Sequence, residues 1–71
     1  MYILHIFAKN VRRYRIENNL SQEKLAELAG LHRTYISAVE REQRNISLSN
    51  IQHIANALKI EPYELLIDGD K

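Results

Sequence analysis

Three side chains suited to reading DNA bases follow one another at Arg33, Thr34 and Tyr35. The guanidinium of Arg33 is a planar fork of donors that matches the O6 and N7 acceptors of guanine. Thr34 can bond a base edge, and Tyr35 can contact a thymine methyl or wedge beside a flexible base step. Ser37 is small enough to let a helix lie deep in a groove. These four residues are predicted base contacts, against plainer roles as solvated, capping or surface-covering residues.

A second group of polar residues is placed to hold the DNA backbone. Gln22 falls in the first turn of a predicted helix, where backbone donors and the helix dipole favour an anion. Arg44, Asn45 and Ser47 follow the predicted reading helix and could reach the other side of the groove. We predict phosphate contacts for these four residues, which would fix register and carry little sequence information. Each one taken alone could equally be an ordinary surface residue.

Gly30 separates the two short helical patterns that must position these groups. Leu25 and Ala29 before it, and Ile36 and Val39 after it, recur at helical spacing. Glycine tolerates the positive φ that a tight turn between helices needs. Two helices that cross at such a corner form a helix-turn-helix, whose second helix enters a DNA major groove.

The whole chain carries helical periodicity, and no run alternates with the period of a strand. We therefore predict a compact all-α domain over residues 1–71, with 6–67 as its core. Five helices are expected at about residues 6–18, 22–29, 33–41, 48–58 and 62–67. The predicted buried residues are Phe7, Val11, Leu25, Ala29, Leu31, Ile36, Val39, Ile51, Ile54, Leu58 and Leu65.

Serines mark two of the predicted helix starts. Ser21 is a suitable N-cap for the second helix. The fourth helix begins at Ser47 or Ser49, and Ser49 with Gln52 fits a capping box. The apolar residues 1–6 leave three roles open: they extend the first helix, pack on the core, or join a partner chain.

Composition narrows the classes of function. A chain of 71 residues without cysteine excludes a disulfide framework and a thiolate metal site, as is usual in a reducing cytoplasm. The apolar start is too short to span a bilayer and lacks a basic lead-in, so we expect a cytoplasmic protein with no membrane partner. A domain this small buries only about 60% of its unfolded surface, and oligomerisation is a common remedy.

The charges are unevenly distributed although the net charge is only +1. Residues 1–45 carry eight Lys or Arg against five Glu, and residues 46–71 carry two Lys against four acidic residues. The motif therefore lies in the basic part, which suits a DNA-facing side. The three histidines are far apart, and no nucleophile–base pair or Gly-rich phosphate loop is visible. We expect no enzyme, no metal, no cofactor and no small-molecule ligand.

Residues 11–66 resemble the phage-repressor and Cro type of helix-turn-helix domain. Within that type, RTYIS followed by ER and RNIS resembles the controller proteins of restriction–modification systems. The resemblance implies that the glutamine at Gln22 binds a phosphate, and that Arg15 and Glu40 form a buried or half-buried ion pair. The chain departs from the family at Glu42, where glycine is common. This departure leaves open a reading helix that runs one turn longer, with Asn45 as its stop.

One reading helix covers too few base pairs for specific binding in a genome. A two-fold dimer reads two half-sites roughly 34 Å apart. The resemblance places the dimer interface on the fourth and fifth helices and the loop between them. The candidates are Asn50, His53, Ile60, Tyr63, Glu64 and Ile67. The alternative is that Tyr63 and Ile67 fold back on their own core.

The combined hypothesis is a homodimeric transcription regulator that binds a pseudo-palindromic operator in double-stranded DNA. The resemblance further implies that it binds its own promoter and times a restriction gene behind a methyltransferase. The second hypothesis is an antitoxin-like protein of the same fold, whose main partner is a toxin. Such proteins usually carry a further segment to wrap the partner, whereas only about five residues follow the fifth predicted helix.

Overall fold

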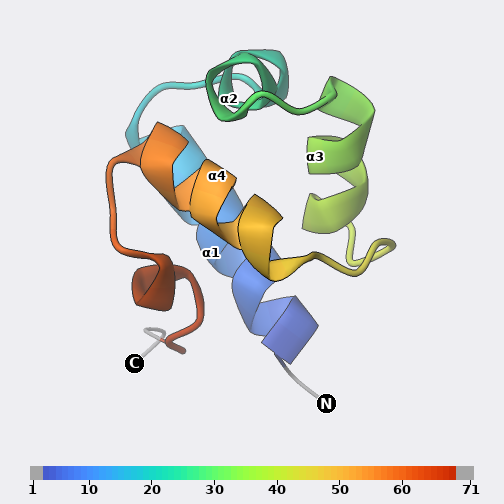
Figure 1. Ribbon diagram of the computed structural model, residues 1–71, viewed down its shortest axis with the longest axis vertical. Helices are drawn as coiled ribbons and strands as arrows, with labels where there is room; N and C mark the ends of the chain where they lie inside the picture. Colours follow the sequence, from blue (N-terminus) through green and yellow to red (C-terminus); the bar gives the residue numbers. More distant parts are fainter. Residues whose placement is uncertain (1–2, 69–71) are drawn as a thin grey trace.

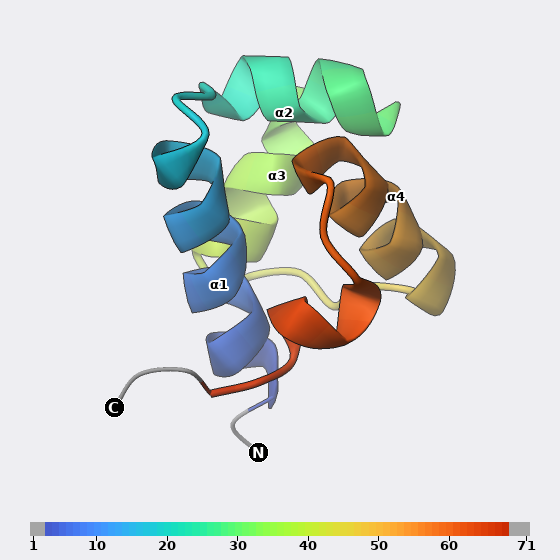
Figure 2. The same ribbon diagram turned by 90° about the vertical axis from the view of Figure 1, so that its left-hand side faces the viewer.

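The computed structural model describes residues 3–68, and every regular element in that range is helical. Figures 1 and 2 show α2 lying across one end of the molecule, with α1, α3 and α4 running away from it. A single 3-10 turn, η1, closes the opposite end beside α1 and α4. The elements are α1 (Ile3–Glu17), α2 (Gln22–Ala29), α3 (Arg33–Glu40), α4 (Leu48–Leu58) and η1 (Pro62–Leu65).

The core lies where α2 packs on α3 and α4 while α1 closes the other side. All the predicted core residues are buried except Leu31, which is half-buried against the edge of the core. Three small residues, Ala8, Ala26 and Ala55, are buried as well. Small side chains at these points let the helix backbones approach closely, which a domain of this size needs to fill its interior.

The two ends of the chain differ from the sequence prediction. The first helix begins at Ile3 instead of residue 6, so the apolar start extends the helix; Met1 and Tyr2 lie outside the described residues. The predicted fifth α-helix is wrong. It is the four-residue turn η1, followed by Leu66 with φ −110° and ψ 2°.

A buried asparagine explains why the chain does not continue as a helix after η1. The Asn10 side chain is 2% exposed, and its amide nitrogen donates to the carbonyl oxygens of both Leu65 and Ile67, each at 2.9 Å. These carbonyls would point along the axis of a continuing α-helix. The tail is instead drawn along α1, and the buried amide gains its partners.

The helix caps follow the predictions at one serine and correct them at another. Ser21 accepts a hydrogen bond from the backbone of Lys24 at 2.9 Å and caps α2. Ser47 caps α4 by accepting from the Asn50 backbone at 3.1 Å, so the predicted capping box at Ser49 is wrong. Because α4 begins directly after Ser47, at Leu48, Ser49 falls inside its first turn.

Because Glu42 replaces the usual glycine, the sequence left open a reading helix that runs one turn longer. This longer helix does not form. α3 ends at Glu40, and Glu42 has a φ of 61°, which is the left-handed conformation usual for glycine. The chain closes with hydrogen bonds from Glu42 to the carbonyl of Val39 and from Gln43 to that of Ala38. This closure satisfies the last carbonyls of the helix, which offsets the steric cost at Glu42.

None of the helices in the described range combines the length and the hydropathy that crossing a lipid bilayer would require.

Lys59 gives a test of backbone strain that is separate from any site. It ends α4 with φ 62°, is exposed, and makes its cap through its backbone N–H. Lys59→Gly should stabilise the domain by about 1 kcal/mol, because glycine adopts this conformation without a Cβ clash. For a chain of this size that raises Tm by about 4–8 °C. Lys59→Ala keeps the Cβ and is the control; an equal gain in both variants would refute the strain argument.

Candidate nucleic-acid interface

A bidentate ion pair joins α1 to the end of α3. The Nε and Nη2 atoms of Arg15 lie 2.7 and 3.1 Å from the two carboxylate oxygens of Glu40. The Glu40 side chain is 2% exposed and that of Arg15 is 12% exposed, so water screens the pair poorly. Arg15 also donates to the Leu20 carbonyl at 2.9 Å, and Gln22 donates to Glu40 at 3.1 Å. The structure thus brings together the two residues expected to form an internal pair.

The hydrogen bonds to Glu40 hold the two helices of the helix-turn-helix to each other and to α1. One carboxylate at the end of α3 is held by a residue of α1 and by the first residue of α2. At the opposite corner Gly30 has φ 73°, and Leu31 donates to the Ala26 carbonyl at 2.8 Å. The angle between α2 and α3 is therefore fixed at two points: the turn that joins the helices, and the Glu40 side chain at the end of α3.

The first turn of α3 faces solvent, as a reading helix requires. Arg33 and Thr34 are exposed, and Tyr35 is half-buried. Ile36 and Val39 on the other side of the helix are fully buried and hold it on the core. In Figure 1, α3 lies at the edge of the molecule, with α2 above it and the connection to α4 below it.

Two arginines from the residues after α3 lie back against its outer face. The Cζ atom of Arg44 is 5.2 Å from the centre of the Tyr35 ring, within cation–π range. Arg41 donates to the Ser37 hydroxyl at 2.7 Å and to the Gln43 side chain at 3.1 Å. Sequence reasoning placed no role on Arg41 or Gln43. The i,i+4 spacing of Ser37 and Arg41 was the available signal.

The predicted phosphate contacts fall in two places beside α3. Gln22, at the start of α2, is half-buried; its side chain donates to Glu40, and it lines a shallow hollow together with Arg33. After the end of α3, Arg44, Asn45 and Ser47 are all exposed. Ser47 also caps α4, where its hydroxyl oxygen is an acceptor and its proton can still be donated to an anion.

The predicted dimer residues lie on α4, on η1 and in the segments just before and after η1. Tyr63 is 62% exposed and Ile67 is 50% exposed, so the alternative that they fold back on their own core is wrong. Glu64 is held in place by accepting from the Glu61 backbone at 2.9 Å. His53 is exposed, while Asn50 and Ile60 are half-buried. Tyr63 and Ile67 therefore leave apolar surface in water in a single copy of the chain.

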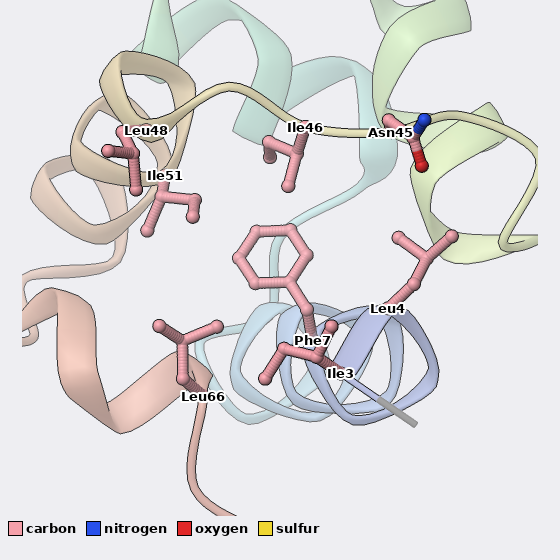
Figure 3. Close-up of a pocket in the computed structure, with 8 residues that line it drawn as sticks. All are labelled: Ile3, Leu4, Phe7, Asn45, Ile46, Leu48, Ile51 and Leu66. Atoms are coloured by element: carbon pink, nitrogen blue, oxygen red, sulfur yellow. The ribbon is translucent and has the colours of Figure 1, made fainter. Parts of the chain in front are cut away.

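An apolar groove of about 340 Å³ lies between the start of α1 and the start of α4. Figure 3 shows Phe7 and Ile46 pointing toward each other across it, with Leu4 and Asn45 to one side. Asn45 supplies its only polar side chain among the residues shown. In the part of the chain that the structure describes, His, Cys, Asp and Glu side chains gather nowhere in threes as a metal site would need.

Comparisons with known proteins agree with this geometry. The helix-turn-helix family matches residues 11–65. Control protein C.SmaI of Serratia marcescens is 56% identical over 66 residues, which cover 93% of this chain and 79% of that protein. Control protein C.BamHI of Bacillus amyloliquefaciens is 52% identical over 62 residues, or 86% of this chain and 76% of that protein.

A solved structure extends the likeness to the fold. The crystal structure of the restriction–modification controller protein C.AhdI from Aeromonas hydrophila has a TM-score of 0.87 and 51% identity, over 92% of this chain and 98% of that chain. The chain therefore belongs to the helix-turn-helix family of phage-repressor type. It is similar over most of its length to the controller proteins of restriction–modification systems, which are DNA-binding transcription regulators.

The ion pair between α1 and α3 predicts a large loss of stability when one partner is removed. Glu40→Ala should cost about 3–5 kcal/mol, because it leaves the Arg15 charge buried without its carboxylate. Urea unfolding at neutral pH measures the loss. Glu27→Ala is the matched control: Glu27 is exposed, lies 3.5 Å from Lys24, and should change stability by less than about 0.5 kcal/mol. Similar small losses in both variants would contradict a structural role for the pair.

Proposed function

We propose that this protein is a homodimeric transcription regulator that binds a pseudo-palindromic operator. The operator would lie in its own promoter, and the regulated genes would be those of a restriction–modification operon. The observation that carries the proposal is the exposed first turn of α3, where Arg33 and Thr34 face solvent. The ion pair between Arg15 and Glu40 holds this helix in place. The similarity to control proteins C.SmaI and C.BamHI supports the genetic setting.

Arg33 is the proposed source of most base discrimination. It is exposed at the start of the reading helix, and the donors of its guanidinium match one guanine in the major groove. Thr34 is exposed beside it, and we assign it a base-edge or methyl contact. Tyr35 and Ser37 are each engaged by an arginine of the same chain, so they would reach bases with that arginine alongside.

Two positive groups are proposed to hold the phosphates on either side of the reading helix. One is the N-terminus of α2 at Gln22, which offers backbone donors and shares a hollow with Arg33. The other is the Arg44 guanidinium, which rests over Tyr35 and can turn one face to a phosphate, with Asn45 and Ser47 following it. These contacts would set the depth and register of α3.

The second copy of the chain is proposed to cover Tyr63 and Ile67. Asn10 holds the main chain of the tail while the Ile67 side chain stays half-exposed, so the apolar surface is presented on a fixed backbone. The remaining candidates, Asn50, His53, Ile60 and Glu64, lie on α4 and in the segment that leads from it through η1. The antitoxin-like alternative has no observation of its own in its favour.

Arg33 and Arg44 should separate base reading from phosphate binding. Arg33→Ala should weaken operator binding by about 1–3 kcal/mol and relax the preference at one guanine, with little change on random DNA. Arg44→Ala is the matched control at the other end of the helix. It should weaken operator and random DNA alike and reduce the salt slope by about one. Fluorescence anisotropy over a salt series measures both.

The outcome that removes Arg33 from base reading is an equal loss on operator and random DNA. The DNA upstream of the protein's own gene is the first operator to footprint. Absence of any protected site there would contradict autoregulation.

Ile67→Asp should disrupt the dimer. A charge in the apolar centre of the proposed interface would raise the dimer dissociation constant at least about tenfold, since burying an unpaired charge is costly. Sedimentation at micromolar concentration gives the state of assembly. Ile16→Asp is the control, because Ile16 is 52% exposed on α1, outside the proposed interface. A wild-type monomer that binds the operator tightly would refute the dimer.

A further inference from the structure

We propose that Arg41 positions Ser37 for base reading and makes it a hydrogen-bond donor, so that Ser37 favours guanine or thymine over cytosine. The Nη1 atom of Arg41 donates to the Ser37 hydroxyl oxygen at 2.7 Å, and its Nε atom donates to the Gln43 side chain at 3.1 Å. This inference rests on the proposed function, because it assigns a second base-reading group to the same interface.

Ser37 lies between two arginines on one side of α3. Residues 33, 37 and 41 are spaced four apart, a spacing that brings side chains one above the other along a helix. Arg33 and Arg41 are exposed, and Ser37 is half-buried between them. If the first turn of α3 enters the groove at Arg33, Ser37 follows one turn further along the same side.

The charge of Arg41 is not neutralised by the carboxylates nearest to it in the sequence. Glu40 pairs with Arg15 of α1, and Glu42 contacts His5 of α1. Among the described residues Arg41 forms no ion pair of its own. Because its bonded partners are neutral side chains, its positive charge acts in full on the hydroxyl that it holds.

The contact with Arg41 limits what the Ser37 hydroxyl can do next. A serine hydroxyl has one donor and two acceptor sites, and Arg41 occupies one of the acceptor sites. The positive charge beside it repels a further donor and polarises the O–H bond, which strengthens the hydroxyl as a donor. In the part of the chain that the structure describes, the hydroxyl donates to no other group, so its proton is available to DNA.

The base edges in the major groove differ in this hydrogen-bonding polarity. Guanine presents two acceptors and thymine presents one, whereas cytosine presents an amino donor and adenine presents one group of each kind. A serine that acts as a donor gains a hydrogen bond from guanine or thymine, but it meets cytosine with donor against donor. Ser37 held by Arg41 therefore adds a base preference that is distinct from the guanine proposed for Arg33.

Selection of binding sites from randomised DNA duplexes tests this proposal. Arg41→Ala and Ser37→Ala should both lose the discrimination against cytosine, and they should lose it at the same position of the half-site. Arg33→Ala should lose its guanine preference at a different position and keep this one. Arg44→Ala is the matched control, because it removes an arginine from the same connection and should weaken binding without changing either preference.

Affinities for the duplex that the wild type selects measure the size of the effect. One hydrogen bond changes an equilibrium by about 2- to 12-fold, so Arg41→Ala and Ser37→Ala should each weaken binding by about that factor. The double variant should lose clearly less than the product of the two single losses, because both substitutions remove the same contact. Thermal melts check that each variant is folded.

Two results would overturn the role of Arg41. One is an unchanged base preference in Arg41→Ala. The other is an equal loss on all sequences with a smaller salt slope, which is the behaviour of a phosphate contact. In either case Arg33→Ala would still change its own position, and the proposed function would stand. A wild type that selects no common sequence would refute the proposed function, and the role of Arg41 with it.

Discussion

The position of the reading helix depends on one buried carboxylate. Glu40 accepts hydrogen bonds from Arg15 of α1 and from Gln22 of α2, so three helices meet at its side chain. Burying two charges costs free energy that their attraction only repays when the geometry is good. The bidentate contact and the added bond to the Leu20 carbonyl supply that geometry. The pair therefore contributes orientation more than stability, and orientation is what the proposed reading helix needs to fit a groove.

The end of the reading helix is governed by backbone conformation instead of charge. Glu42 occupies a conformation that glycine usually fills, and the chain folds back so that Arg41 and Arg44 contact the outer face of α3. A longer helix would have kept Arg41 one turn from Ser37 but would have carried Arg44 away from Tyr35. The same turn places the Glu42 carboxylate next to His5, so a local departure from the family pattern also creates a contact with α1.

The small size of the domain shapes its opposite face. A chain of 71 residues has one interior, and here it is filled by small and branched side chains around Phe7. Leu48, Tyr63 and Ile67 remain exposed in a single copy of the chain. The buried amide of Asn10 holds the tail in place, so the exposed apolar groups sit on an ordered main chain. Such a surface suits an interface between copies of the chain.

The sequence by itself determined the four α-helices apart from the start of α1, the glycine corner and nearly all of the core, because helical periodicity and the φ tolerance of Gly30 act over a few residues. It also placed Arg33 and Thr34 on the outer face of α3, since Ile36 and Val39 fix the inner one. Only the tertiary structure decided how α3 ends, why η1 stays short, and which side chains hold Ser37 and Tyr35. Each of these depends on a partner distant in the sequence or on the path of a turn. Asn10 is hydrogen-bonded to Leu65, 55 residues away in the sequence, and His5 contacts Glu42, 37 residues away. No local sequence pattern encodes contacts at such separations.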